Sequence, residues 1–442
     1  MLDFIKYISP SWYFNQKSNN QIPYFVDYGL LKQSEIEHCN FYSGYSNQTA
    51  QKIDVAYQLW RQGYISNDID KSLVWNEKEV SLKDKYIFIN RFFKKHRSFL
   101  VLIFRLLELK NPIKEFHSFI QAIRISQIKL GNHFTHDIHV SSTEFLSENP
   151  LVSVIIPTLN RYQYLTNVFQ DLEKQTYKNF EVIVFDQSEP FNEDFYKNWN
   201  LKMHVVHQQE KALWLARNSA IKMSKGELIL LYDDDSLIEG DWIENHINCL
   251  NFFKCEISSG ASISVVGGEV PKHYSYFRWS DQIDTGNVML KREVFEKIGL
   301  FDRQFEGQRK GDGEFGLRAY LAGFKNVGNP LSKRVHLKVS EGGLRQMGSW
   351  DAWRPKKFFA PRPIPSVLYL TRKYFGTKAA FIEIIISAFP SIVPYKFKRN
   401  RKLMFLGILI GFFLSPMLLI SVIRSWRLAS IKLRQGSKIE YL

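Results

Sequence analysis

The sequence predicts an α/β protein whose central part, residues 151–348, is a layered domain of alternating strands and helices. Three observations lead to this class. First, short apolar runs alternate there with segments of helical periodicity, which is the pattern of βα layered domains. Second, 45% of the 442 residues are hydrophobic, which is enough to build a sizeable core. Third, polar side chains follow the predicted strands directly, and sheets of this class bind ligands beyond the carboxyl ends of their strands.

Each element of this domain is predicted from its local pattern, in chain order. Residues 152–156 form an apolar run that Pro157 ends. The next segment places Leu165, Val168, Phe169 and Leu172 on one face of a helix. Further strands are expected at 180–185, 203–207 and 227–232, and further helices at 213–225 and 242–253.

The two ends of the chain differ from this domain. Residues 1–149 show no repeat and no catalytic motif, and we expect an accessory region that is largely helical. Residues 349–442 are basic and apolar. From Arg354 onward the chain has 17 Lys and Arg against Glu383 and Glu440, so the whole net charge of +15 lies there and the rest is formally neutral. The sequence therefore predicts three regions, 1–149, 150–348 and 349–442.

Residues 403–423 of the third region carry no charge, and this run would be about 31 Å long as a helix, close to the thickness of a bilayer core. Basic clusters flank it on both sides, which predicts association of a helical tail with an anionic membrane. Pro416 predicts a kink within the run. A single crossing, a re-entrant loop and a buried helix of a soluble domain remain the alternatives.

Composition also limits compartment and partners. Three cysteines cannot build a disulfide framework or a four-thiolate zinc site. Residues 1–10 lack the basic-then-apolar pattern of a signal peptide, so we expect the protein at the cytoplasmic face of the cell membrane. Nucleic acid is not an expected partner, because the excess bases border an apolar run instead of lying among stacking aromatic residues.

Three consecutive aspartates, Asp233, Asp234 and Asp235, follow the predicted strand at 227–232. Such a cluster is costly unless a cation neutralises it, and hard oxygen ligands suit Mg²⁺ or Mn²⁺. With a strand period of two, Asp233 and Asp235 project to one side and Asp234 to the other. The alternative is an acidic turn that caps the helix near Asp241.

Six motifs in this order resemble family 2 glycosyltransferases, which have the GT-A nucleotide-sugar-binding fold. They are VSVIIPTLNR at 152–161, EVIVFD at 181–186, ARN at 216–218, GELILLYDDD at 226–235, TGNVMLKREVFEKIGLFD at 285–302 and KGDGEFGLR at 310–318. The resemblance covers about 200 residues, the size of one domain, and neither end of the chain. It implies a mixed, mainly parallel sheet flanked by helices, and transfer of a sugar from a nucleotide diphosphate to a glycan or lipid-linked acceptor.

The resemblance also implies roles for individual residues. Asp186 would hydrogen-bond the base, Arg217 would reach the base or the diphosphate, and Arg345 would reach the diphosphate from a Gly-Gly lid. The residues expected to bind the nucleotide sugar are Pro157, Thr158, Asn160, Arg161, Asp186, Arg217, Asp233, Asp234 and Arg345. The expected metal ligands are Asp233, Asp235 and His336, with a purely structural histidine as the alternative for His336.

Asp312 matches the family's general base, and one base without a nucleophile implies a single displacement with inversion. Its alternative role is to cap a helix that begins near Glu314.

Some positions depart from the family pattern. Gly311 stands where the family has the glutamate of its Glu-Asp motif, and Ala220 replaces a usual glycine. Processive synthases carry Gln-x-x-Arg-Trp, whereas residues 346–350 read QMGSW, so we expect transfer of a single sugar.

Two other functions stay open. A nucleotidyltransferase of related fold would favour a glycine-rich loop after the first strand, but residues 158–161 contain no glycine. A membrane-attached, non-catalytic nucleotide-sugar-binding or scaffold protein would keep the fold without turnover. A donor that is a uridine diphosphate sugar would be compatible with Asp186.

Overall fold

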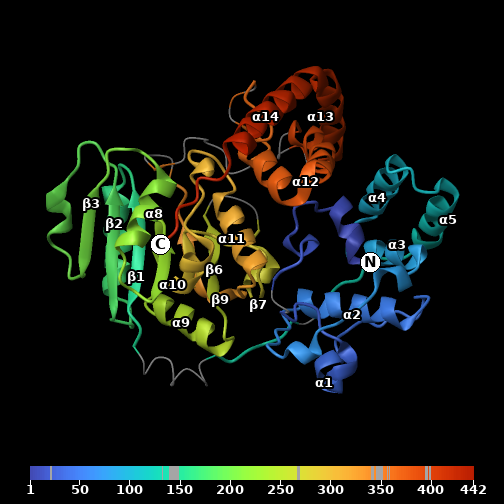
Figure 1. Cartoon of the computed structure of the whole chain (residues 1–442), viewed down its shortest axis with the longest axis horizontal. Coiled ribbons are helices and arrows are strands. Elements are labelled where there is room, and N and C mark those ends of the chain that lie inside the picture. Colours follow the sequence, from blue (N-terminus) through green and yellow to red (C-terminus); the bar gives the residue numbers. More distant parts are fainter. Residues whose placement is uncertain are drawn as a thin grey trace.

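The computed structural model describes residues 1–19, 22–131, 133–138, 149–265, 269–339, 343–344, 352–355, 357, 359–393, 397 and 400–442. A mixed sheet with helices on both faces forms the centre of the molecule (Figure 1). The N-terminal helices lie beside one end of this sheet, and the C-terminal helices lie above it.

The sheet contains nine described strands in the order β3-β2-β1-β4-β8-β6-β9-β5, with β7 paired to β9. Strands β1, β2, β3 and β4 run parallel, and β1 aligns Val152 with Phe180 and Thr158 with Asp186. Strand β8 is antiparallel to both β4 and β6, which makes the sheet mixed. The strands are β1 Val152–Thr158, β2 Phe180–Asp186, β3 Met203–His207, β4 Leu228–Tyr232, β5 Ser236–Ile238, β6 Ile257–Ser264, β7 Arg278–Trp279, β8 Asn287–Lys291 and β9 Asn326–His336.

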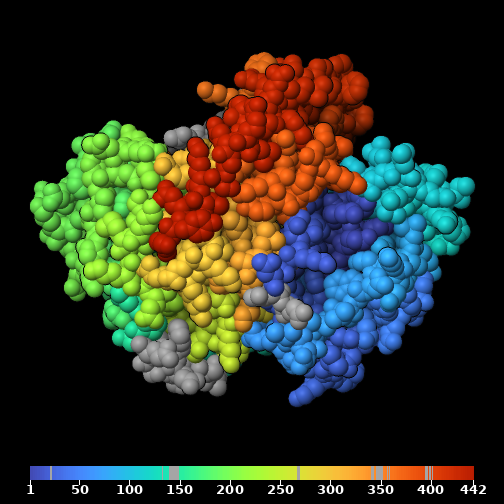
Figure 2. Space-filling model, viewed as in Figure 1, coloured from blue at the N-terminus to red at the C-terminus, as the bar shows by residue number. Residues whose placement is uncertain are grey.

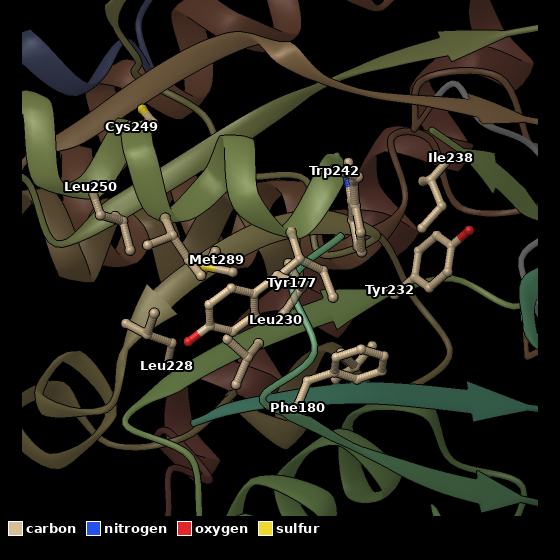
Figure 3. Close-up of a cluster of buried hydrophobic side chains, with 14 of the residues drawn as sticks. Tyr177, Phe180, Leu228, Leu230, Tyr232, Ile238, Trp242, Cys249, Leu250 and Met289 are labelled. Atoms are coloured by element: carbon tan, nitrogen blue, oxygen red, sulfur yellow. The ribbon is translucent and has the colours of Figure 1, made fainter. Parts of the chain in front are cut away.

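Buried apolar layers join the helices to each face of the sheet. Alternate residues of β1 point to opposite faces, so Val154 packs toward α7 and α9 whereas Ile155 packs toward α8, α10 and α11. Figure 3 shows the first layer, where Trp242 and Leu250 of α9 lie against Leu228 and Leu230 of β4. These helices are α7 Tyr162–Glu173, α8 Leu213–Met223, α9 Trp242–Phe252, α10 Arg292–Ile298 and α11 Gly311–Ala322.

The strands and helices predicted between residues 152 and 253 are confirmed, with small changes at their ends. Strand β1 continues through Pro157 to Thr158. Helix α8 ends at Met223 because Ser224 has extended backbone angles. The strand β5, directly after Asp235, was not predicted, because three residues are too few to show a period. The predicted α/β class, with a mixed sheet and a helical C-terminal region, is confirmed.

The N-terminal region is helical, and its apolar core also includes Ile382 of α12, the helix Pro365–Ser387. It contains α1 Gln33–Ile36, α2 Gln48–Arg61, α3 Leu82–Phe92, α4 Lys95–Leu107 and α5 Pro112–Ala122. A buried ion pair between Arg91 of α3 and Asp54 of α2, 2.7 Å apart, joins two of these helices. The region docks on α11, where the Tyr13 hydroxyl donates a hydrogen bond to the carbonyl of Gly313 and Ser18 donates one to the carbonyl of Tyr320.

The C-terminal region consists of α12 Pro365–Ser387, α13 Arg401–Phe413 and α14 Ser415–Gln435. Within the described residues, no single helix is long and apolar enough to cross a membrane. Residues 402–413 and 415–435 form a pair bent by 68° that together has the length and the apolar composition of a membrane span. The bend lies directly before Pro416, where the sequence predicts a kink. After α14 the chain returns to the sheet domain and ends beside α8 and α10 (Figure 1).

Candidate functional site

A cavity of about 130 Å³ opens at the carboxyl ends of β1 and β4. Five carboxylates and four cationic side chains line it, together with polar and apolar groups from the loop before α11. Its lining residues are Pro157, Arg161, Leu213, Trp214, Arg217, Asp233, Asp234, Asp235, Asp284, Thr285, Gly307, Gln308, Arg309, Lys310, Gly311, Asp312 and Leu344. Six of the residues predicted to bind the donor or to act as base therefore line this cavity together with Asp235.

The three predicted metal ligands lie together. Ligand atoms of Asp233, Asp235 and His336 are all within 4.8 Å of one another. Strand β5 begins at Ser236 and pairs with His336 of β9, which is why two residues a hundred positions apart meet here. The Nε2 atom of His336 is buried and makes no hydrogen bond, although Asp235 Oδ1 lies 3.2 Å away. A buried nitrogen that faces two carboxylates is suited to bind a divalent cation.

Two arginines form ion pairs with the carboxylate of Asp233. Arg217 of α8 donates to Oδ1 at 2.9 Å, and Arg334 of β9 donates to Oδ2 at 2.7 Å. Arg334 also bonds Asp284 at 2.8 Å, so its guanidinium bridges two carboxylates. The Nε atom of Arg217 is buried without a hydrogen-bond partner, and the side chain lines the cavity. Arg217 therefore has donor capacity left for an anionic ligand.

Asp234 projects away from the metal-ligand cluster. It accepts hydrogen bonds from the Thr158 hydroxyl at 2.8 Å and from Arg161 at 2.6 Å. Burial raises the pKa of Asp234 to about 6, against the opposing charge of Arg161. The triplet does not cap α9, because Asp241 is the N-cap residue of that helix and its side chain makes no capping hydrogen bond.

Asp312 lies in the first turn of α11 and lines the same cavity. This helix begins at Gly311, so Asp312 is not the cap of a helix that starts near Glu314. Its Oδ1 accepts a hydrogen bond from the backbone N–H of Gly313 at 2.7 Å. Burial raises the pKa of Asp312, and the charge of Asp284 raises it further. A carboxylate with a raised pKa is a better proton acceptor near neutral pH.

Three predicted nucleoside-binding residues, Thr158, Asn160 and Asp186, are not among the lining residues of this cavity. Both oxygens of Asp186 are engaged, Oδ1 by the N–H of Ser188 at 2.8 Å and Oδ2 by the hydroxyls of Tyr162 and Tyr196. The amide oxygen of Asn160 accepts from the N–H of Glu189 at 3.1 Å. Arg345 and the QMGSW motif fall outside the described residues.

Sequence reasoning missed Asp284, Arg334 and Trp214. Arg334 lies two residues before His336, so a strand period of two places it on the same side of β9. Asp284 directly precedes the motif that starts at Thr285. Trp214 lies one turn before Arg217 on α8 and packs under its guanidinium at 5.2 Å. Spacing along the strand and helix could have identified Arg334 and Trp214.

Comparisons with known proteins give a family likeness for the central part of the chain. Residues 153–311 match the sequence profile of glycosyl transferase family 2. The chain is 32% identical over 192 residues to the glycosyltransferase GlyG of Streptococcus pneumoniae, an alignment that covers 42% of this chain and 59% of that protein. It is 29% identical over 227 residues to the uncharacterized glycosyltransferase RT0329 of Rickettsia typhi, covering 46% of this chain and 70% of the relative. The chain thus spans less than two thirds of the pneumococcal relative.

Two solved structures are similar at a low level. The first, Staphylococcus aureus TarS 1-349 in complex with UDP-GlcNAc, is 18% identical with a TM-score of 0.41, covering 63% of this chain and 83% of that one. GalNAc-T7 with UDP, GalNAc and Mn²⁺ is 16% identical with a TM-score of 0.39, covering 42% and 44%. Neither likeness bears on the ligands of the cavity at these TM-scores.

Proposed function

Since residues 153–311 belong to glycosyl transferase family 2, we propose that this protein transfers a single sugar from a nucleotide-diphosphate sugar to a hydroxyl group of a glycan or lipid-linked acceptor. The reaction is proposed to invert the anomeric carbon and to depend on a divalent metal. The identity of the sugar and of the nucleotide is left to experiment, with uridine diphosphate sugars tested first.

One observation carries the proposal. The base candidate Asp312 and the candidate metal ligands Asp233 and Asp235 line the same cavity, and His336 lies close to these two aspartates. Sugar transfer from a diphosphate needs a proton acceptor for the attacking hydroxyl on one side of the anomeric carbon and charge stabilisation for the departing diphosphate on the other. One cavity therefore holds a candidate group for each of these two functions.

The side chains present fit a divalent metal. Two carboxylates and a buried imidazole nitrogen without a hydrogen bond form a ligand set that Mn²⁺ and Mg²⁺ accept. Asp235 and His336 would hold the ion together with Asp233, whose carboxylate Arg217 and Arg334 fix in place. Bound there, the ion would neutralise negative charge on the leaving diphosphate.

The protein's own residues account for the remaining steps. Asp312 takes the proton of the acceptor hydroxyl, and the hydroxyl oxygen forms its bond to the anomeric carbon as the bond from that carbon to the diphosphate oxygen breaks. The diphosphate leaves with the electron pair of that bond, and Arg217 lies in the wall to receive its charge. Because Asp312 is a base and not a nucleophile here, one displacement occurs and the configuration inverts.

A screen of nucleotide sugars tests this function. We expect a Mn²⁺-dependent rise in the melting temperature of the purified protein with one donor and not with the others. That donor should then support transfer, and Asp312→Asn should lower the transfer rate by ~10²–10⁴-fold while keeping the thermal shift. Full transfer by Asp312→Asn would refute the assignment of the base. No shift with any donor would favour a scaffold without turnover.

A further inference from the structure

The helix α5 exposes an apolar stripe, although its buried face already packs Phe119 and Ala122 into the N-terminal core. Ile113, Phe116 and Ile120 are spaced by three and four residues and lie exposed, Ile113 at 79%. The opposite face of α5 is buried and includes Glu115, which accepts hydrogen bonds from Arg105 and Tyr86. The exposed stripe therefore needs an apolar environment outside the protein.

Basic side chains surround this stripe. Residues 94–129 contain eight Lys and Arg against two acidic residues, Glu108 and Glu115. Both acids are paired internally, Glu115 with Arg105 and Glu108 with Lys378 at 2.7 Å. The outward charge around the α4–α5 hairpin is therefore positive, although residues 1–353 together carry no net charge.

The helix α13 is exposed almost all round. All nine of its large apolar side chains, from Leu403 to Phe413, are exposed, with Phe412 at 71% and Phe413 at 79%. It contacts the protein through Gly407 and Gly411, whose small size lets Val393 and Phe389 approach the helix. Lys402 and Arg424 flank the apolar part, so this helix repeats the combination of exposed apolar and basic side chains.

An apolar groove lies between the N-terminal and the C-terminal helices. This groove of about 450 Å³ lies between α4 and α12 and is lined by Phe104, Leu107, Phe381 and Ile385, together with the ion pair of Glu108 and Lys378. Phe381 in turn stacks on Trp426 of α14, with ring centroids 4.8 Å apart. Figure 1 shows α4 and α5 beside α12, α13 and α14 on the upper right of the molecule, and Figure 2 shows both groups of atoms along that side.

Both ends of the apolar run in α13 and α14 are tied to the same folded body. Before it, α12 packs on the sheet domain, and the N–H of Ser366 donates to Gln308 of the cavity wall at 2.9 Å. After it, Leu300 donates to the carbonyl of Glu440 at 2.7 Å, and Lys438 donates to Asp302 at 2.9 Å. The C-terminal end of the chain, drawn in red, crosses the sheet domain in Figure 2. A single crossing would put these two attachments on opposite sides of a bilayer.

We propose that α4–α5, residues 377–385 of α12 and the bent pair α13–α14 form one docking face for an anionic lipid bilayer. The bent pair enters the near leaflet and returns, and the α5 stripe lies in the headgroup boundary. Apolar burial and attraction of the bases to anionic lipid act together, as two-signal membrane binding requires. In this proposal the N-terminal region forms the second membrane contact of the protein.

Flotation with vesicles tests the face, using the purified full-length protein without any donor sugar. We expect binding to vesicles of phosphatidylcholine with phosphatidylglycerol, and binding weaker by about tenfold or more to phosphatidylcholine alone. The pair Ile113→Glu and Phe116→Glu, and separately the pair Phe412→Glu and Phe413→Glu, should each reduce binding by about tenfold or more. Met223→Glu is the control, because Met223 is exposed on α8, outside the proposed face.

Circular dichroism confirms that each variant is folded before its binding is compared. If the folded α5 variant bound vesicles as well as the wild type does, the N-terminal helices would not belong to the face. Equal binding to anionic and to neutral vesicles would overturn the proposal. So would a stable dimer of the protein that hides Phe412 and Phe413 and leaves vesicles unbound.

A protease-protection experiment tests whether the C-terminal helices cross the bilayer. A tag placed after Leu442 should remain open to protease added outside preformed vesicles, whereas protection of the tag would show a crossing. These readouts use no donor and no transfer, so they can fail while the proposed glycosyltransferase activity stands, and the reverse.

Discussion

The charge state of Asp312 gives a test at the scale of one residue. Burial raises its pKa, so the folded protein binds the proton more tightly than the unfolded chain does. The stability that this proton gives is present at low pH and is lost as the pH rises through the raised pKa of the folded state. We therefore expect Asp312→Asn to melt at a higher temperature than the wild type at about pH 7, and the difference to shrink toward about pH 4.

Differential scanning fluorimetry across this pH range measures the effect. The hydrogen bond from Gly313 to Asp312 acts in the opposite direction, because it favours the carboxylate. A lower melting temperature for Asp312→Asn at neutral pH would mean that this hydrogen bond outweighs the burial of charge.

His336 gives a second residue-scale test. Its buried Nε2 faces Asp235 without a hydrogen bond, so removal of the ring should weaken metal binding directly. We expect His336→Ala to lower Mn²⁺ affinity by about tenfold or more, measured by calorimetry in the absence of donor. His204→Ala is the matched control, because His204 is a half-exposed histidine of β3 at the other edge of the sheet. Unchanged affinity in His336→Ala would return this histidine to a structural role.

At the scale of elements, the close approach of β9 to the turn before β8 holds the site together. A Cβ on Gly286 would overlap Arg334 Nη1 and Asp233 Oδ2. We expect Gly286→Ala to displace this ion pair and to lower the transfer rate by about 10²-fold, with a smaller effect on donor affinity. Steady-state kinetics measure both quantities.

Gly328→Ala provides the control on β9, where the nearest atom to the new Cβ would be 3.5 Å away. Equal losses in the two variants would show that any added side chain near β9 is harmful, and would remove the specific role of the Arg334 pair.

The same elements show what the sequence could predict. Strand β1, helix α7 and strand β4 followed from apolar periodicity, because each buries a regular set of side chains. The position of Asp235 opposite His336 followed only from family resemblance, since pairing between β5 and β9 joins residues far apart in the chain. Arg334 bridges Asp233 and Asp284 through such long-range pairing, and no local pattern reveals that contact.

At the scale of the whole molecule, residues 437–442 connect the C-terminal helices to the sheet domain. Three hydrogen bonds join them to Leu300, Asp302 and Arg303. A chain ending after Gln435 should lose about 2–4 kcal/mol of unfolding free energy with these bonds. Urea denaturation measures the loss, and a chain ending after Glu440 is the control, because it keeps all three. Equal stability of the two truncated chains would show that the segment contributes nothing.

The exposed apolar surface of α4–α5 and α13 was only partly predictable. Residues 403–423 are recognisable because an uncharged run of that length is rare in a soluble helix. The stripe on α5 could not be assigned, since Ile113, Phe116 and Ile120 have the spacing of an ordinary core-facing helix. Which face of α5 is buried depends on Glu115, Arg105 and Tyr86, and that requires the tertiary structure.

The near balance of charge in the cavity has a thermodynamic consequence. Five aspartates and four cations line it, and Arg334 behind them supplies a fifth positive charge. A nucleotide-diphosphate sugar brings about two negative charges into this nearly neutral space, and a divalent cation brings two positive ones. Each should therefore bind better when the other is present, and linkage requires the two enhancement factors to be equal. Donor and cation would then enter the protein as a neutral pair, and neither would bind tightly alone.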